Sequence, residues 1–346
     1  MEFDIFSTVS LTEALNQKLP AKRFLAQTFF GIKLWATQQV GLDTVNGSRR
    51  IAPFVRPHQK GTAVKGASVT TRMFTPSQIN LYTRTEAVEA YKRAPGETIS
   101  YANGQVREPE DVAGDMIGDD QRDLVNMSYR TIEKMCADAM FTGVVIMRDE
   151  NGAEIDRVDL GLKASHNLTL SSNTGWNKSG TDPLKNLRDW KRAVVKDSGL
   201  NAGIVVMGSK AYDAFISNAS VKEYLNLRNI TLGAVKPGEV SNGATLMGNV
   251  EGLDIWVYDE WYIDPATGNE VSVVPEEKVC VVARDIRATV HFGAIADVEA
   301  GNFMGEFFSR IYNEPDGSAR YVQVRSAPLS VVEQIDGLLV ADVIEA

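Results

Sequence analysis

The chain contains 346 residues, of which 44% are hydrophobic, and its formal net charge at pH 7 is −9. This acidic balance argues against a protein whose main task is to coat nucleic acid, because neutralising phosphates needs a net basic surface. The sequence has no run of about 20 apolar residues and no N-terminal signal pattern, so we expect neither a membrane partner nor secretion.

The first part of the chain predicts an arm that docks on another surface. Leucines from Leu11 to Leu19 recur at helical spacing until Pro20 interrupts the pattern, and an apolar patch follows. We take three aromatic side chains of this patch as candidate contacts of the arm: Phe29, Phe30 and Trp35.

The next segment, from Thr44 to Thr85, is basic although the whole chain is acidic. It holds seven cationic side chains and no Asp or Glu: Arg49, Arg50, Arg56, Lys60, Lys65, Arg72 and Arg84. Residues 1–107 contain 14 Lys and Arg against 7 Asp and Glu, whereas residues 108–346 contain 22 against 38. This division points to nucleic acid or to a protein partner with the opposite charges, and a second copy of the chain qualifies. Alternating apolar and polar residues with several Pro and Gly predict an extended two-stranded excursion, which needs another surface to lie on.

A long helix is predicted over Pro109–Thr142. Pro109 suits the first turn, acidic residues flank it at the positive end of the helix dipole, and Gly143 supplies the stop. Such a helix extends on the order of 50 Å at 1.5 Å per residue, and few compact enzymes need a rod of that length. Two apolar runs, 144–147 and 155–160, then flank a turn sequence and predict a β-hairpin.

Residues 161–182 are rich in Ser, Asn, Gly and Thr and predict a linker into a second domain. Asp182 as N-cap and Pro183 as first residue begin a helix that ends at Gly199. A strand at 204–207, helices at 209–217 and 220–228, and strands at 254–258, 271–274 and 279–283 follow. Strand patterns return at 303–312 and 320–326, so the whole predicts an α+β fold with a mixed sheet and, at this length, two domains.

The residues that carry most enzyme chemistry are scattered. The only histidines are His58, His166 and His291, and none lies in a metal-ligand motif. Cys136 and Cys280 fall in apolar patterns that predict buried, reduced thiols. No nucleophile, phosphate-binding loop or acid and base pair has the required spacing, so we predict no enzyme activity, no catalytic residues, no cofactor and no metal.

The order of these pieces resembles a tailed-bacteriophage major capsid protein and, more narrowly, the lambda head-protein family, which has the Hong Kong 97 phage fold. The most specific pieces are the stretch Asp149–Leu162 and the closing strand–turn–strand that ends in Ser326, Ala327, Pro328 and Leu329. The resemblance covers nearly the whole chain. It implies an N-arm at 1–43, an E-loop at 44–96, a peripheral domain at 97–165 and 298–346 with a spine helix near 109–142, and an axial domain at 166–297.

The same resemblance implies a structural protein of the virion, assembled in the cytoplasm of a host bacterium. Copies of the chain would form hexamers and pentamers of an icosahedral shell around double-stranded DNA, which is bound without sequence specificity. Portal, scaffolding and decoration proteins are further implied partners. The arm aromatics and the seven basic side chains become intersubunit contacts. Some capsids of this fold join an E-loop lysine to a neighbouring asparagine, which makes Lys60 and Lys65 candidates, although salt bridges are the preferred interpretation.

Three alternatives stay open from the sequence. A cellular protein shell of the same fold, similar to encapsulins, would carry an inner pocket for a cargo peptide. A soluble α+β enzyme is disfavoured by the scattered chemistry. Direct DNA binding by the segment Thr44–Thr85 is the third, although nucleic-acid binders usually interleave aromatic residues with the charges, and aromatic residues are sparse here.

Overall fold

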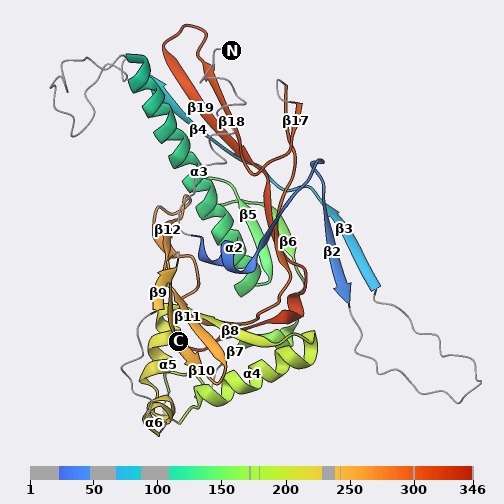
Figure 1. The fold of residues 1–346 in the computed structure, drawn as a ribbon, viewed down its shortest axis with the longest axis vertical. Coiled ribbons are helices and arrows are strands. Elements are labelled where there is room, and N and C mark those ends of the chain that lie inside the picture. The colour runs from blue at the N-terminus through green and yellow to red at the C-terminus, as the bar shows by residue number, and fades with distance from the viewer. Residues whose placement is uncertain are drawn as a thin grey trace, which may run out of the picture.

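The protein is elongated and is built around one long helix, with sheets beside it and beyond its C-terminal end (Figure 1). The computed structural model describes residues 23–46, 68–86, 109–170, 173–178, 180–227, 238–241, 243–298 and 301–344. Within those ranges, no helix combines the length and the apolar character needed to cross a membrane.

The long helix is α3, Pro109–Phe141, and it confirms the helix predicted over Pro109–Thr142. Its second half turns an apolar stripe toward the larger hydrophobic core, where several of its side chains are almost fully buried: Leu124, Ile132, Met135, Cys136 and Met140. This spacing of three and four residues is the periodicity of a helix face. Burial of that face, more than helix propensity, stabilises α3.

A glycine ends the helix and starts the predicted hairpin. Gly143 has a φ of 68°, and a Cβ at this position would lie 2.5 Å from the Cβ of Leu162, so a side chain has neither the backbone freedom nor the space. Strands β5, Val144–Arg148, and β6, Glu154–Asp159, then pair antiparallel, which confirms the predicted hairpin.

A three-stranded antiparallel sheet lies along the first half of α3, in the order β18-β19-β4 (Figure 1). Its strands are β4, Ile79–Glu86, β18, Phe308–Asn313, and β19, Ala319–Ser326. Side-chain hydrogen bonds join sheet and helix: the Thr85 hydroxyl donates to Asp120 at 2.9 Å, and Gln121 Nε2 donates to Ser309 Oγ at 2.9 Å.

A second three-stranded sheet joins the beginning of the described chain to its last part. Strand β1, Gly31–Leu34, pairs parallel with β15, Ala288–Phe292, which pairs antiparallel with β20, Pro328–Val332. Helix α2, Phe24–Phe29, comes directly before β1. A short ribbon of β16, Ile295–Asp297, and β17, Gly301–Phe303, follows β15.

The largest sheet has seven strands in the order β7-β21-β14-β8-β11-β10-β9. Strands β8 and β11 are parallel, whereas β14 is antiparallel to β8, so the predicted mixed sheet of an α+β protein is confirmed. The bounds are β7 Asn167–Thr169, β8 Ala202–Met207, β9 Gly238–Ser241, β10 Ala244–Val250, β11 Leu253–Tyr258, β14 Lys278–Ala283 and β21 Leu338–Asp342.

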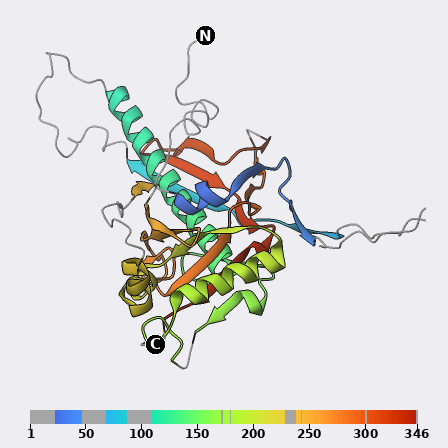
Figure 2. The same cartoon turned by 60° about the horizontal axis from the view of Figure 1, so that its bottom comes forward.

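Helices α4, Pro183–Ser198, α5, Ser209–Ser217, and α6, Ala219–Leu227, accompany this sheet at the end of the molecule that Figure 2 brings forward. The α4 caps are those that the sequence predicts. The Asp182 carboxylate accepts from the N–H groups of Leu184 and Lys185 at 3.1 and 3.2 Å, and Gly199 has a φ of 82°. A second core fills the space between helices and sheet, with Trp176 stacked on Trp190.

The C-terminal strand β21 lies in a different sheet from the one that the domain range given by the resemblance implies. Residues 298–346 were expected with the peripheral domain, but β21 is hydrogen-bonded between β14 and β7 inside the seven-stranded sheet. Its residues Leu338 to Ala341 are fully or almost fully buried there. The physical reason is local: four consecutive apolar side chains are buried on both faces of a strand only in the interior of a sheet.

Candidate intersubunit surfaces

The basic segment contains a two-stranded ribbon that leaves the body of the molecule (Figure 1). Its strands are β2, Val40–Asn46, and β3, Ser68–Phe74, which pair antiparallel. Arg72 is exposed on this ribbon, and Met73 next to it is 61% exposed. Five of the predicted contacts lie outside the described residues: Arg49, Arg50, Arg56, Lys60 and Lys65.

Arg84, which the sequence grouped with the free basic segment, belongs to a strand of the subunit's own sheet. It lies on β4 and pairs in register with Tyr321 of β19. Its guanidinium forms ion pairs of 2.8 Å with Glu86 and 3.5 Å with Glu314, so two carboxylates of the same chain already compensate its charge. Both pairs are exposed, and such pairs stabilise little.

Helix α2, at the root of the predicted arm, is attached to α3 by a buried carboxylate. Arg23 occupies the N-cap of α2 and makes no side-chain cap hydrogen bond. The Glu133 side chain takes that role: its Oε1 accepts from the Leu25 N–H at 2.7 Å, and its Oε2 accepts from the Ala26 N–H at 3.0 Å. Glu133 is 2% exposed. A cap that would normally come from the neighbouring sequence therefore comes from a residue 107 positions away.

The electrostatics of this anchor follow from its burial. Removal from water raises the pKa of Glu133, while the two N–H donors and the nearby Arg23 partly oppose the shift. The Arg23 guanidinium lies 3.5 Å from the centre of the Tyr129 ring, a cation–π contact. Burial also raises the pKa of Tyr129 to about 12. Glu133 thus acts as a structural acceptor for the arm helix.

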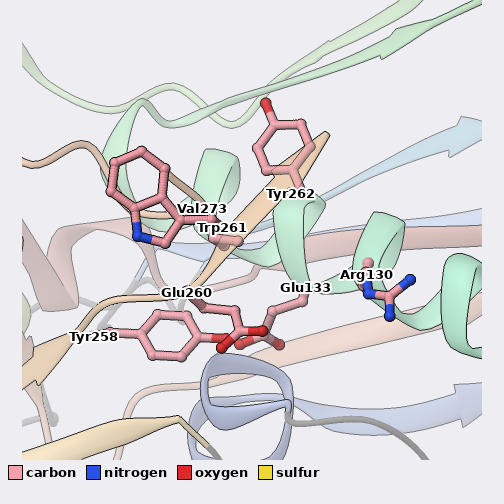
Figure 3. A pocket seen from close by; sticks show the side chains of 7 residues that line it. All are labelled: Arg130, Glu133, Tyr258, Glu260, Trp261, Tyr262 and Val273. Atoms are coloured by element: carbon pink, nitrogen blue, oxygen red, sulfur yellow. The ribbon is translucent and has the colours of Figure 1, made fainter. Parts of the chain in front are cut away.

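A cavity of about 220 Å³ opens beside Glu133, between α3 and a small ribbon of β12, Trp261–Ile263, and β13, Glu270–Ser272. Figure 3 shows the side chains that line this cavity, among them Glu133, Tyr258 and Glu260. Burial, and then the Glu133 charge, raise the pKa of Tyr258. The lining residues are Arg130, Glu133, Tyr258, Glu260, Trp261, Tyr262 and Val273. In the described part of the chain, no three His, Cys, Asp or Glu side chains are grouped so that they can hold a metal ion.

The predicted arm aromatics fall in two different environments. Phe29 and Phe30 are each 7% exposed and pack in the larger core of their own chain, which accounts for both rings without a neighbour. Trp35 is half-buried, and its Nε1–H donates to His291 Nδ1 at 3.0 Å. A contact of Phe29 or Phe30 with another subunit stays a prediction, and the burial of the two rings does not favour it.

The outer face of the β18-β19-β4 sheet carries three adjacent tyrosines, which we call the tyrosine patch: Tyr82, Tyr312 and Tyr321. Tyr312 stacks on Tyr321 with ring centres 5.0 Å apart, and Tyr82 lies 6.0 Å from Tyr321. Tyr82 is 62% exposed and Tyr312 39%. Exposed tyrosines are typical of protein interfaces. The sequence showed each tyrosine only as an alternate strand residue, because strand pairing alone brings them together.

The position of Glu133 in the sequence already indicates a structural role, although the helix prediction above does not include it. Glu133 follows Tyr129 by four residues and precedes Cys136 by three, so it lies on the buried stripe of α3. A charged residue inside an apolar helical stripe needs a partner at close range. That partner is the backbone of α2.

Comparisons with known proteins agree with this architecture over nearly the full length. The family described as phage major capsid protein E matches residues 7–343. The chain is 22% identical to the major capsid protein of Escherichia phage lambda over 339 residues, covering 96% of this chain and 97% of the relative. It is 23% identical to the major capsid protein of Enterobacteria phage P21 over 350 residues, covering 98% and 99%.

A solved structure, the putative capsid protein of a prophage of E. coli CFT073, matches with a TM-score of 0.72 at 16% identity, covering 98% of this chain and 99% of the other. The fold is therefore the Hong Kong 97 type, which confirms the expected architecture class. The family match favours a phage shell over a cellular shell of the same fold and over a soluble enzyme. The chain belongs to the phage major capsid protein E family and is a structural protein of a phage head shell.

Proposed function

We propose that this protein assembles with itself into hexamers and pentamers of an icosahedral shell that encloses double-stranded DNA without reading its sequence. The observation that carries this proposal is the β2–β3 ribbon, which leaves the body of a molecule whose copies build a shell (Figure 1). A two-stranded ribbon is marginally stable alone, so a neighbouring copy has to supply the surface on which it lies. We expect no catalytic activity.

The charge pattern supports a specific contact for the basic segment. Seven acidic residues lie between positions 108 and 123, in and just before the first half of α3: Glu108, Glu110, Asp111, Asp115, Asp119, Asp120 and Asp123. The side chains of Asp119 and Asp123 are exposed. We propose that the seven basic side chains of residues 44–85 on one copy face this acidic half of α3 on a neighbour, with Arg84 contributing least because its charge is compensated within its own chain. Such complementarity sets register and rate of association more than affinity.

The domain ranges are part of the same proposal. The N-arm, E-loop, peripheral and axial domains follow the ranges given by the resemblance, except that β21 is assigned to the axial sheet because it pairs with β14. Trp35, beside the exposed strand β1, is the remaining arm contact that we propose for a neighbour. Portal, scaffolding and decoration proteins complete the particle, which assembles in the cytoplasm of the host bacterium.

Negative-stain microscopy of the expressed protein tests the proposal. We expect closed shells, tubes or ring-shaped capsomers, and a population of compact monomers under every condition contradicts it.

A denaturing gel of mature particles tests covalent joining through Lys60 or Lys65: we expect one band near 37.9 kDa, whereas a ladder of covalent oligomers overturns the salt-bridge interpretation. Retention of double-stranded DNA by unassembled protein at physiological salt would favour the DNA-binding alternative for the basic segment.

A further inference from the structure

Among the described residues, strand β1 has an open edge. It is the outermost strand of the β1-β15-β20 sheet, and all four of its residues are exposed. Ile32 and Leu34 alternate onto one face and are 57% and 41% exposed. Lys33 lies between them on the other face, with its ammonium 4.5 Å from the centre of the Trp35 ring. An exposed apolar edge of this kind is a template on which a further strand pairs.

The sequence contains a segment whose pattern matches that edge. Residues 2–6 read Glu-Phe-Asp-Ile-Phe, within the 22 residues that precede the described part of the chain. In an extended strand Phe3 and Ile5 share one face, and Asp4 points to the other. The pattern is the complement of β1, in which two apolar side chains flank a cation.

Pairing the two segments about Asp4 and Lys33 satisfies both faces at once. The carboxylate then lies opposite the ammonium, while Phe3 and Ile5 lie beside Ile32 and Leu34. Because each apolar–charged–apolar triplet is centred on its charge, this match holds for a parallel and for an antiparallel strand. Opposite charges and apolar side chains that face each other across strands both stabilise a sheet.

We propose that residues 2–6 of a second copy add to β1 as a further strand, so that neighbouring subunits are joined through the main chain at this edge. The inference deepens the proposed function and rests on it, because the shell supplies the second copy at high effective concentration. It names β1 as the strand that receives the arm of a neighbouring copy. Phe29 and Phe30 do not identify that surface, because both rings are buried in their own chain.

Mixed shells of two single-cysteine variants test the pairing. Asp4→Cys chains and Lys33→Cys chains are assembled together, oxidised and separated on a non-reducing gel, since directly opposed strand residues come within the reach of a disulfide. The native thiols Cys136 and Cys280 are buried and give little background. We expect a cross-linked dimer whose joined peptide, identified by mass spectrometry, contains positions 4 and 33. The matched control replaces Asp4→Cys by Thr8→Cys, a position that does not lie opposite Lys33 in the proposed register. Shells with this control variant are expected not to form the cross-linked dimer.

Two other outcomes of the cross-linking experiment overturn the inference. Closure of an Asp4→Cys/Lys33→Cys chain on itself, without the mixed dimer, assigns the strand to the same chain. Absence of any cross-link in shells of normal appearance removes the pairing but leaves the proposed function intact, since the shells have formed. If a cysteine variant fails to assemble, charge exchange decides: Lys33→Glu is expected to lower the fraction of chain in shells several-fold, and Asp4→Lys in the same chain to restore it. Failure to restore contradicts the pairing.

Discussion

At the scale of single residues, Glu133 connects the arm to the spine of the molecule. Its two carboxylate oxygens accept from two free N–H groups in the first turn of α2, and it lies in a stripe of buried apolar side chains. Glu133 is therefore a buried ionisable group that is hydrogen-bonded to backbone donors. Because these donors come from another part of the chain, Glu133 couples the position of α2 to that of α3.

Removing this carboxylate is expected to destabilise the subunit. Glu133→Ala leaves the buried Leu25 N–H and the partly buried Ala26 N–H without an acceptor, and each unsatisfied group costs about 1–3 kcal/mol. Urea denaturation of unassembled protein should show a lower midpoint. Glu133→Gln is the matched control, since it keeps the shape and one acceptor oxygen, and its midpoint should lie between those of Glu133→Ala and the wild type. An unchanged midpoint for Glu133→Ala would show that water replaces the carboxylate without loss.

The stability of the subunit should also depend on pH through the same residue. The folded-state pKa of Glu133 is raised by burial, so its contribution to stability is fully present below the pKa of an ordinary glutamate and is lost as pH rises through the raised value. The wild type should therefore lose stability relative to Glu133→Gln as the pH rises above about 4, the ordinary pKa of a glutamate. Urea midpoints of both proteins across this range measure the difference, and a gap that widens in favour of the wild type would reverse the predicted sign.

At the scale of elements, two glycines illustrate how differently backbone and packing constrain the chain. Gly118 lies inside α3, and a Cβ there would meet nothing within 4 Å. Gly208 precedes α5, and a Cβ there would lie 2.4 Å from the Pro275 carbonyl oxygen and 2.5 Å from Glu276 Cα. The first glycine weakens a helix without a packing reason in the subunit, whereas the second allows two backbones to approach closely.

Alanine at these positions should have opposite effects. Gly118→Ala is expected to stabilise the unassembled subunit by about 0.5–1 kcal/mol, because alanine loses less conformational entropy in a helix. Gly208→Ala is expected to destabilise it by about 1–3 kcal/mol, since the close atoms belong to backbone that has to shift. Thermal unfolding of both variants measures the two signs. Equal shifts of the unfolding temperature for the two variants would show that the free space around each glycine does not decide the effect of alanine.

At the scale of the whole molecule, the distribution of charge and the projecting ribbon belong together. The basic residues cluster in the early part of the chain and the acidic residues in the remainder, so neighbouring copies can meet head to tail although each carries a net charge of −9. A protein with this net charge needs a locally complementary contact, because uniform surfaces of like charge repel one another.

Reversing part of the basic segment should therefore weaken assembly. Arg56→Glu with Lys60→Glu is expected to reduce the fraction of chain in shells several-fold at low salt, measured by sedimentation, and to matter less as salt screens the contact. Adding Asp119→Lys with Asp123→Lys should restore assembly if the acidic half of α3 is the partner. Lys185→Glu with Lys222→Glu makes the same change of net charge on exposed positions of α4 and α6. If that control is equally defective, the effect comes from net charge, and the proposed contact is wrong.

The sequence by itself determined the elements whose limits are set by neighbouring residues. The caps of α4, the end of α3 at Gly143, helix α5 and the hairpin β5–β6 all follow from local hydrogen bonding and backbone freedom, which a short stretch of sequence contains. The order of these elements was enough to identify the family. It also located the basic segment, since charge is a property of composition.

Only the tertiary structure decided which distant segments meet. It placed Arg84 on a strand paired with β19, assembled the tyrosine patch from three strands, supplied the α2 cap from Glu133 and inserted β21 between β14 and β7. Each of these arrangements needs at least one contact between residues far apart in sequence, and its free energy depends on burial that exists only after the chain has folded. A single sequence records which side chains need a partner, but the packing of the whole chain selects the partner.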